Sequence, residues 1–101
     1  MKSDASNIVA IFIESHEGLF ERFVNIYIFG SILDKNRISK DVDILLVYEK
    51  YSSKVQDDLT VIQTSLEKEL EMFVDFTVLS IEEEKEVSFI DRLKNSYQKL
   101  K

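Results

Sequence analysis

The chain has 101 residues, a formal net charge of −6 and 45% hydrophobic residues, so we expect one folded domain covering 1–101. It holds no cysteine and a single histidine, which excludes disulfides, thiolate chemistry and histidine-rich metal centres and leaves oxygen-ligated ions such as Mg²⁺ or Mn²⁺. There is no visible basic face for gripping long nucleic acids, no signal peptide and no membrane-spanning run. A cytoplasmic protein that binds neither a membrane nor extended nucleic acid is the expectation.

The first half is predicted to hold a helix and two strands. Apolar residues recur at helical spacing from about Asp4 to Phe23, and the β-branched and aromatic run from Val24 to Phe29 is typical of a buried strand. A polar loop follows the Gly30-Ser31 pair, and a second apolar strand runs from Val42 to Tyr48.

The second half is predicted to alternate helix, strand and helix. A helix spans Ser52 to about Met72, and a third strand spans Phe73 to Leu79. Ser80 and Glu83 form a capping box that opens a last helix, whose first turn holds the acidic run 82–84, an arrangement that the helix dipole favours and that requires no metal. The apolar stripe of this last helix is Val87, Ile90, Leu93, Tyr97 and Leu100.

Three acids interrupt the apolar strands. Asp41 and Asp43 fall on the same face of one strand, about 7 Å apart along it, where two like charges are costly unless a proton or a cation neutralises them. Asp75 lies between Val74 and Phe76 in the third strand. If the two strands are neighbours, three carboxylates converge, and such a set can hold the two divalent ions used in phosphoryl or nucleotidyl transfer. The Gly30-Ser31 turn adds backbone N–H groups and a hydroxyl that suit a phosphate.

Together these motifs resemble a known family. Phe29-Gly30-Ser31, then Asp41-Val42-Asp43, then a lone Asp75 in a later strand is similar to the nucleotidyltransferase superfamily typified by DNA polymerase β. The size and the order of elements look most like its minimal bacterial and archaeal members, over roughly residues 8 to 80. The fold expected is α/β (α+β), a small mixed sheet with helices packed on one side and the acids at its open edge.

The resemblance implies roles for individual residues. Gly30 and Ser31 would contact the phosphates of ATP or another nucleoside triphosphate, Asp41 and Asp43 would ligate Mg²⁺, and Asp75 would bind the metal nearest the acceptor and help to deprotonate the attacking hydroxyl. Lys40 stands where a serine often precedes the first acid.

The loop departs from the pattern of the family. Residues 32–34, Ile-Leu-Asp, occupy positions where many minimal members have a small residue and an arginine. Lys35, Arg37 and Lys40 could neutralise a triphosphate instead, or could be solvated loop residues.

Simpler interpretations remain for the acids. Asp41 and Asp43 could be exposed strand-edge charges, although the Gly30-Ser31 turn and Asp75 would then be coincidences. Asp75 by itself could be a surface acid, since a single charge on the solvent face of a strand is common.

Two functions follow. The first is a Mg²⁺-dependent nucleotidyltransferase (EC 2.7.7-type) that moves NMP, AMP from ATP in particular, to a hydroxyl on a partner, since 101 residues leave no room for an acceptor-binding domain. By analogy with minimal members, the partner would be a small helical HEPN-type protein in a toxin–antitoxin pair. The second is a nucleotidyltransferase-like antitoxin with weak or no catalysis that acts by complex formation. A homo-oligomer is left open.

Overall fold

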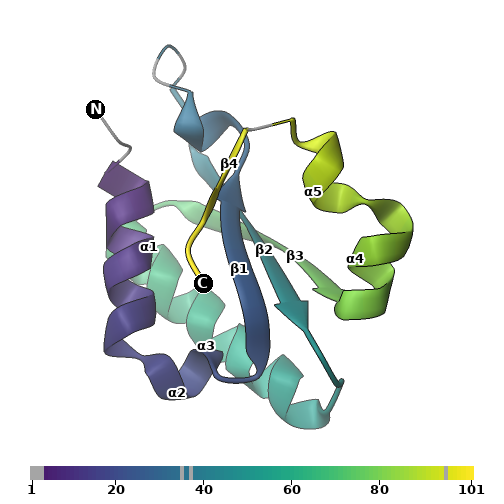
Figure 1. Cartoon of the computed structure of the whole chain (residues 1–101). Coiled ribbons are helices and arrows are strands. Elements are labelled where there is room, and N and C mark those ends of the chain that lie inside the picture. Colours follow the sequence, from purple (N-terminus) through teal and green to yellow (C-terminus); the bar gives the residue numbers. More distant parts are fainter. Residues whose placement is uncertain (1–3, 35, 37, 95) are drawn as a thin grey trace.

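The computed structural model describes residues 4–34, 36, 38–94 and 96–101. Its centre is a four-stranded sheet in the order β3-β2-β1-β4 (Figure 1). Strand β1 (Phe23–Phe29) pairs antiparallel with β2 (Asp41–Tyr48) and with β4 (Tyr97–Lys99), whereas β2 and β3 (Phe73–Ser80) run parallel. The mixed sheet of the α/β class expected from the sequence is therefore confirmed.

The helices lie on both sides of this sheet. Helices α1 (Asp4–Ser15), α2 (Glu17–Phe20) and α3 (Ser53–Leu70) cover one face, and the short helices α4 (Ile81–Val87) and α5 (Phe89–Arg92) lie apart from them (Figure 1). The expectation that the helices pack on one side holds for the first three only. The single helix expected over 4–23 is divided at His16 and ends before β1.

The main core lies between the sheet and helices α1 to α3. Every second residue of β2 points into it, and Val42, Ile44 and Leu46 are almost completely buried there. Val55, Ile62 and other residues of one face of α3 close this layer from the other side. Burying each such side chain contributes about 1.5–3 kcal/mol, so this face supplies most of the stability of the fold.

A smaller apolar cluster occupies the opposite face of the sheet. It is built from the alternate residues of the same strands, with Tyr27, Leu45 and Val47 at its centre. Ile81 of α4 and Phe89 of α5 pack against it, and the capping box of Ser80 and Glu83 that opens α4 is present as the sequence predicted. Helices α4 and α5 thus cover the part of this face where the strand residues are apolar.

Strand β4 was not expected. The apolar residues 87–100 fit a helical period, but Ser88 and Lys94 have positive φ angles of 49° and 48°, which interrupt the helix, and Tyr97–Lys99 pairs with β1 instead. Tyr97 packs edge-on against Tyr27, with ring centroids 5.7 Å apart. Pairing with β1, which is distant along the chain, outweighs the local helical period, because it partly buries Tyr97 and satisfies backbone groups along the edge of β1.

Helix α3 holds the outer edge of β3 in place. The N–H of Val74 donates to the Glu67 carboxylate at 2.9 Å, and the Gln63 amide donates to the Val74 carbonyl at 2.8 Å. These two bonds satisfy the edge of the strand one residue before Asp75 and fix its register against β2. Within the described residues, no helix is long and apolar enough to cross a membrane.

Candidate active site

The three acids lie on one face of two neighbouring strands. In the parallel pairing of β2 with β3, Asp43 is the register partner of Asp75, so both side chains leave the same face of the sheet side by side. Asp41 lies on that face two residues earlier and is paired with Phe73. Asp41 and Asp75 are exposed, and Asp43 is half-buried between them. The topology thus brings together the three acids that the sequence singled out.

The pKa of Asp43 reflects its burial and the two acids beside it. Burial raises the pKa of its carboxyl above the ordinary value, and the neighbouring charges of Asp75 and then Asp41 raise the pKa further. The ionised form of Asp43 is therefore destabilised by its position. A bound cation would reverse this penalty, because it favours the charged form.

Gly30 is shaped around the Asp43 carboxylate. It follows β1 directly and has φ 86° and ψ −158°, which L side chains rarely adopt, and a Cβ at this position would lie 2.6 Å from Oδ2 of Asp43. Its N–H donates to the Ser96 carbonyl at 3.2 Å. The glycine therefore makes room for a carboxylate, and its own N–H is not free for the phosphate contact that the sequence suggested.

Ser31 begins a single 3₁₀ turn, η1 (Ser31–Leu33), and is tied to a residue that the sequence reasoning missed. The Ser39 hydroxyl donates to the Asp41 carbonyl at 2.9 Å and lies 3.0 Å from the Ser31 hydroxyl. Because a hydroxyl has one hydrogen, Ser31 must be the donor to Ser39. The remaining donors at the start of the turn are the N–H groups of Ser31 and Ile32, which a helical turn leaves unsatisfied.

Ser39 stands one residue before the position where the family pattern has a serine, and that shift explains why it was overlooked. The sequence Ser39-Lys40-Asp41 carries an extra residue between the serine and the first acid. In the structure, Ser39 nevertheless links the Gly30-Ser31 turn to the start of β2.

The rest of the loop contributes little polar chemistry. Ile32 and Leu33 pack against the main core, which accounts for the apolar side chains at these two positions. Lys40 is exposed, and its carbonyl accepts a hydrogen bond from the Phe73 N–H at 3.3 Å. Lys35 and Arg37 lie outside the described residues.

The site can be tested for its fit to a divalent cation. Among the described residues, no group of three or more Asp, Glu, His or Cys side chains is gathered closely enough to form a ready metal site. The side chains of Asp41 and Asp75 are exposed, however, and their charges contribute to the raised pKa of Asp43. An all-oxygen set with a glycine cradle around the central carboxylate is the donor chemistry that suits Mg²⁺ or Mn²⁺.

Comparison with known proteins supports the fold. No family model matches the sequence, and no curated protein matches it. A crystal structure from Sulfolobus solfataricus, described as that of "a putative nucleotidyltransferase", aligns with a TM-score of 0.53 at 22% identity. The alignment covers 92% of this chain and 76% of that chain. The chain has the fold of that protein.

Proposed function

We propose that this protein is a Mg²⁺-dependent nucleotidyltransferase that transfers AMP from ATP to a hydroxyl group of a partner protein. The observation that supports it most is the adjacency of Asp43 and Asp75 in the parallel pair, with Asp41 on the same face and Gly30 shaped around the central carboxylate. A sheet held together by burial has no reason to collect like charges there. The fold shared with the archaeal protein agrees with the proposal.

The reaction would be a single displacement at phosphorus. The acceptor oxygen attacks the α-phosphorus, the bond from that phosphorus to the bridging oxygen of the β-phosphate breaks, and pyrophosphate leaves. The proton of the acceptor hydroxyl passes to the carboxylate of Asp75, which is exposed and adjacent to Asp43. Asp41, Asp43 and Asp75 would hold Mg²⁺, which supplies charge neutralisation of the triphosphate when bound.

The Gly30-Ser31 turn and the start of β2 would position the triphosphate. The N–H groups of Ser31 and Ile32 would donate to phosphate oxygens, while Ser39 holds the turn against the start of β2. Catalysis of this kind depends on preorganised charge, so the loss of one acid should cost orders of magnitude in rate with little change in fold.

The partner proposed from the sequence is a small helical HEPN-type protein. The face that bears the acids is open, since Asp41 and Asp75 are exposed. The described residues form one sheet with its helices and no separate acceptor-binding unit. The acceptor would therefore approach from outside this unit.

A second candidate is an antitoxin that neutralises its partner by binding alone. The observations that favour it are the engaged N–H of Gly30, the engaged hydroxyl of Ser31, and the packing of Ile32 and Leu33 into the core. All three reduce the number of phosphate contacts that the turn offers as it stands.

Intact-mass spectrometry separates the two candidates. The protein would be incubated with ATP, Mg²⁺ and the product of a neighbouring short helical reading frame with an Arg-x-x-x-x-His motif. We expect the partner to gain the mass of AMP with the wild type, to gain little with Asp41→Asn/Asp43→Asn, and to be modified normally by Asp57→Asn, which removes an exposed acid of α3. An unmodified partner that is still neutralised by the double variant would establish the binding role instead.

A further inference from the structure

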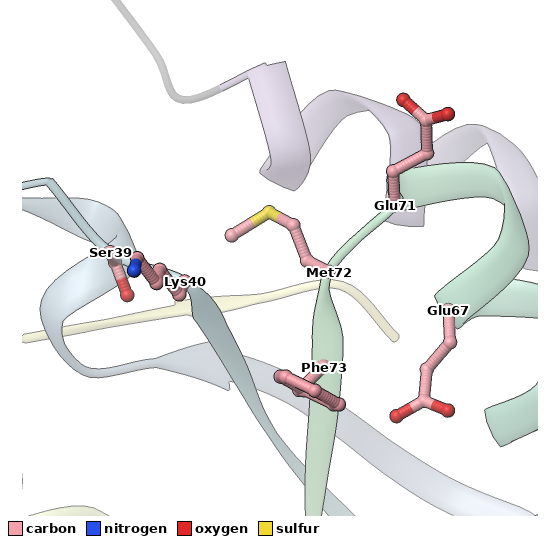
Figure 2. Close-up of a pocket in the computed structure, with 6 residues that line it drawn as sticks. All are labelled: Ser39, Lys40, Glu67, Glu71, Met72 and Phe73. Atoms are coloured by element: carbon pink, nitrogen blue, oxygen red, sulfur yellow. The ribbon is translucent and has the colours of Figure 1, made fainter.

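A pocket of about 520 Å³ opens at the start of β2 and β3 (Figure 2). Ser39 and Lys40, from the end of the loop before β2, lie on one side of it, and Met72 and Phe73 lie on the other. The carboxyl groups of Glu67 and Glu71 complete its lining on the α3 side.

The pocket is physically continuous with the acid site. Phe73 is the register partner of Asp41, so its Cα lies one inter-strand spacing, about 4.8 Å, from the first acid. The Phe73 N–H donates to the Lys40 carbonyl, which joins the two walls through the backbone. Ser39, in the wall, is hydrogen-bonded to Ser31 of the turn. A molecule whose phosphates lie at the turn and the acids therefore meets the pocket within the length of one nucleoside.

The chemistry of the walls suits a flat heteroaromatic ring. Phe73 is 71% exposed although it is the first residue of a strand, and Met72 beside it extends toward Ser39 and Lys40 (Figure 2). An aromatic face with a polarisable thioether is a good stacking surface for a base. Across the pocket, the Lys40 ammonium can donate to the nitrogen and oxygen acceptors on the edge of a base.

The carboxylate of Glu67 is not free to compete for this role. It accepts the N–H of Val74 and so belongs to the bonds that hold β3. Figure 2 shows it beyond Phe73, on the side away from Lys40. The binding surface is thus apolar on the β3 side and carries Lys40 on the loop side, while Glu71 lines it from the end of α3.

We propose that this pocket binds the base of the nucleoside triphosphate, stacked on Phe73 and Met72 with its polar edge toward Lys40. The inference rests on the proposed nucleotidyltransferase function and gives a physical reason for its use of ATP, since a purine covers more of the stacking surface than a pyrimidine does. It also assigns Lys40 to the base and not to the triphosphate.

The test compares ATP, UTP and inorganic tripolyphosphate, each with Mg²⁺, by isothermal titration calorimetry on the whole chain. Phe73→Ala should weaken ATP binding by roughly tenfold, as the loss of one base-stacking partner does. It should weaken UTP binding less and leave tripolyphosphate binding unchanged. The matched control is Tyr51→Ala, which removes an aromatic ring that is 60% exposed beyond the other end of β2 and should change none of the three.

The possible outcomes separate the failure of the base-binding pocket from the failure of the nucleotidyltransferase function. If the wild type binds tripolyphosphate and ATP, but Phe73→Ala and Tyr51→Ala leave ATP affinity alike, the base lies elsewhere and the proposed function stands. If Phe73→Ala weakens the binding of tripolyphosphate as much as that of ATP, the substitution has acted on the fold. The assignment of the base to this pocket is then overturned. If the wild type binds neither probe with Mg²⁺, both the pocket assignment and the nucleotidyltransferase proposal fail.

Discussion

The two faces of the sheet are built from alternate residues of the same strands, yet they serve different purposes. Along β2, Val42, Ile44 and Leu46 are buried under α1 to α3, and the residues between them change from Asp41 and Asp43 to Leu45 and Val47. The second face is thus apolar where α4 and α5 cover it and charged where it is open. Stability therefore comes from the covered face, while the charge of Asp43 at the open end of the other face lowers stability and is explained by the binding role proposed above.

The largest expected effect is on the covered face. Ile44→Ala should destabilise the protein by about 2–5 kcal/mol, because it leaves a cavity in the main core. Urea unfolding followed by circular dichroism measures this loss, and the Mg²⁺ affinity of the folded variant, measured without urea, should stay as in the wild type. A loss below about 1 kcal/mol would contradict the assignment of this face as the source of stability.

Gly30→Ala tests the close approach of the turn after β1 to the Asp43 carboxylate. The side chain would meet the Asp43 carboxylate at 2.6 Å and would have to adopt φ 86°, so we expect a loss of about 1–3 kcal/mol. Thermal unfolding of Gly30→Ala in the Asp43→Ala background provides the control, since removing the carboxylate leaves only the strain of the backbone. Equal losses in both backgrounds would show that the close approach to Asp43 costs nothing.

Mg²⁺ should stabilise the wild type through the charged end of the second face. At ten times its Kd, a ligand that binds only the folded state adds about 1.4 kcal/mol. We expect a rise in Tm with millimolar Mg²⁺ that EDTA reverses and that Asp41→Asn/Asp43→Asn abolishes. Asp57→Asn should retain the rise, and identical melting of wild type and double variant under all conditions would rule out a metal site.

The smallest effect concerns the charge of Asp43 without metal. The pKa of the Asp43 carboxyl is raised in the folded state, so the folded protein binds a proton at Asp43 more tightly than the unfolded chain does. At pH 7 the ionised carboxylate therefore lowers the free energy of unfolding. This loss of stability disappears as the pH falls through the folded and then the unfolded pKa. Asp43→Asn should therefore be more stable than the wild type at pH 7 in EDTA, by a few tenths to about 1 kcal/mol. The difference should shrink as pH falls toward 4 in urea titrations. A gain that grows on acidification would have the wrong sign for a raised pKa.

Much of this arrangement could be predicted from the sequence because it follows from local pattern. Strands around Ile26, Ile44 and Val74 carry apolar runs, and α3 carries a clean helical stripe, so the elements that bear the acids were predicted to within a few residues. The parallel pairing that puts Asp43 beside Asp75 required only that the two strands be neighbours.

The parts that could not be predicted depend on contacts between distant residues. Strand β4 exists because Tyr97–Lys99 pairs with β1, which the helical spacing of its apolar residues conceals. The bond from Gly30 to the Ser96 carbonyl depends on this strand, and so does the finding that the N–H of the glycine is engaged. The role of Ser39 and the pocket beside Phe73 likewise require coordinates, since neither has a sequence pattern of its own.

The two bonds that join α3 to Val74 have a consequence for how this chain can tolerate insertions. Side chains alternate along β3, so one added residue between α3 and β3 would either break the bonds from Glu67 and Gln63 or turn Asp75 to the apolar face. Residues added among 34–38, between η1 and β2, would leave β2 and β3 in register. We therefore expect length variation among functional homologues to gather in that loop, and the connection of Glu71 and Met72 to keep its length.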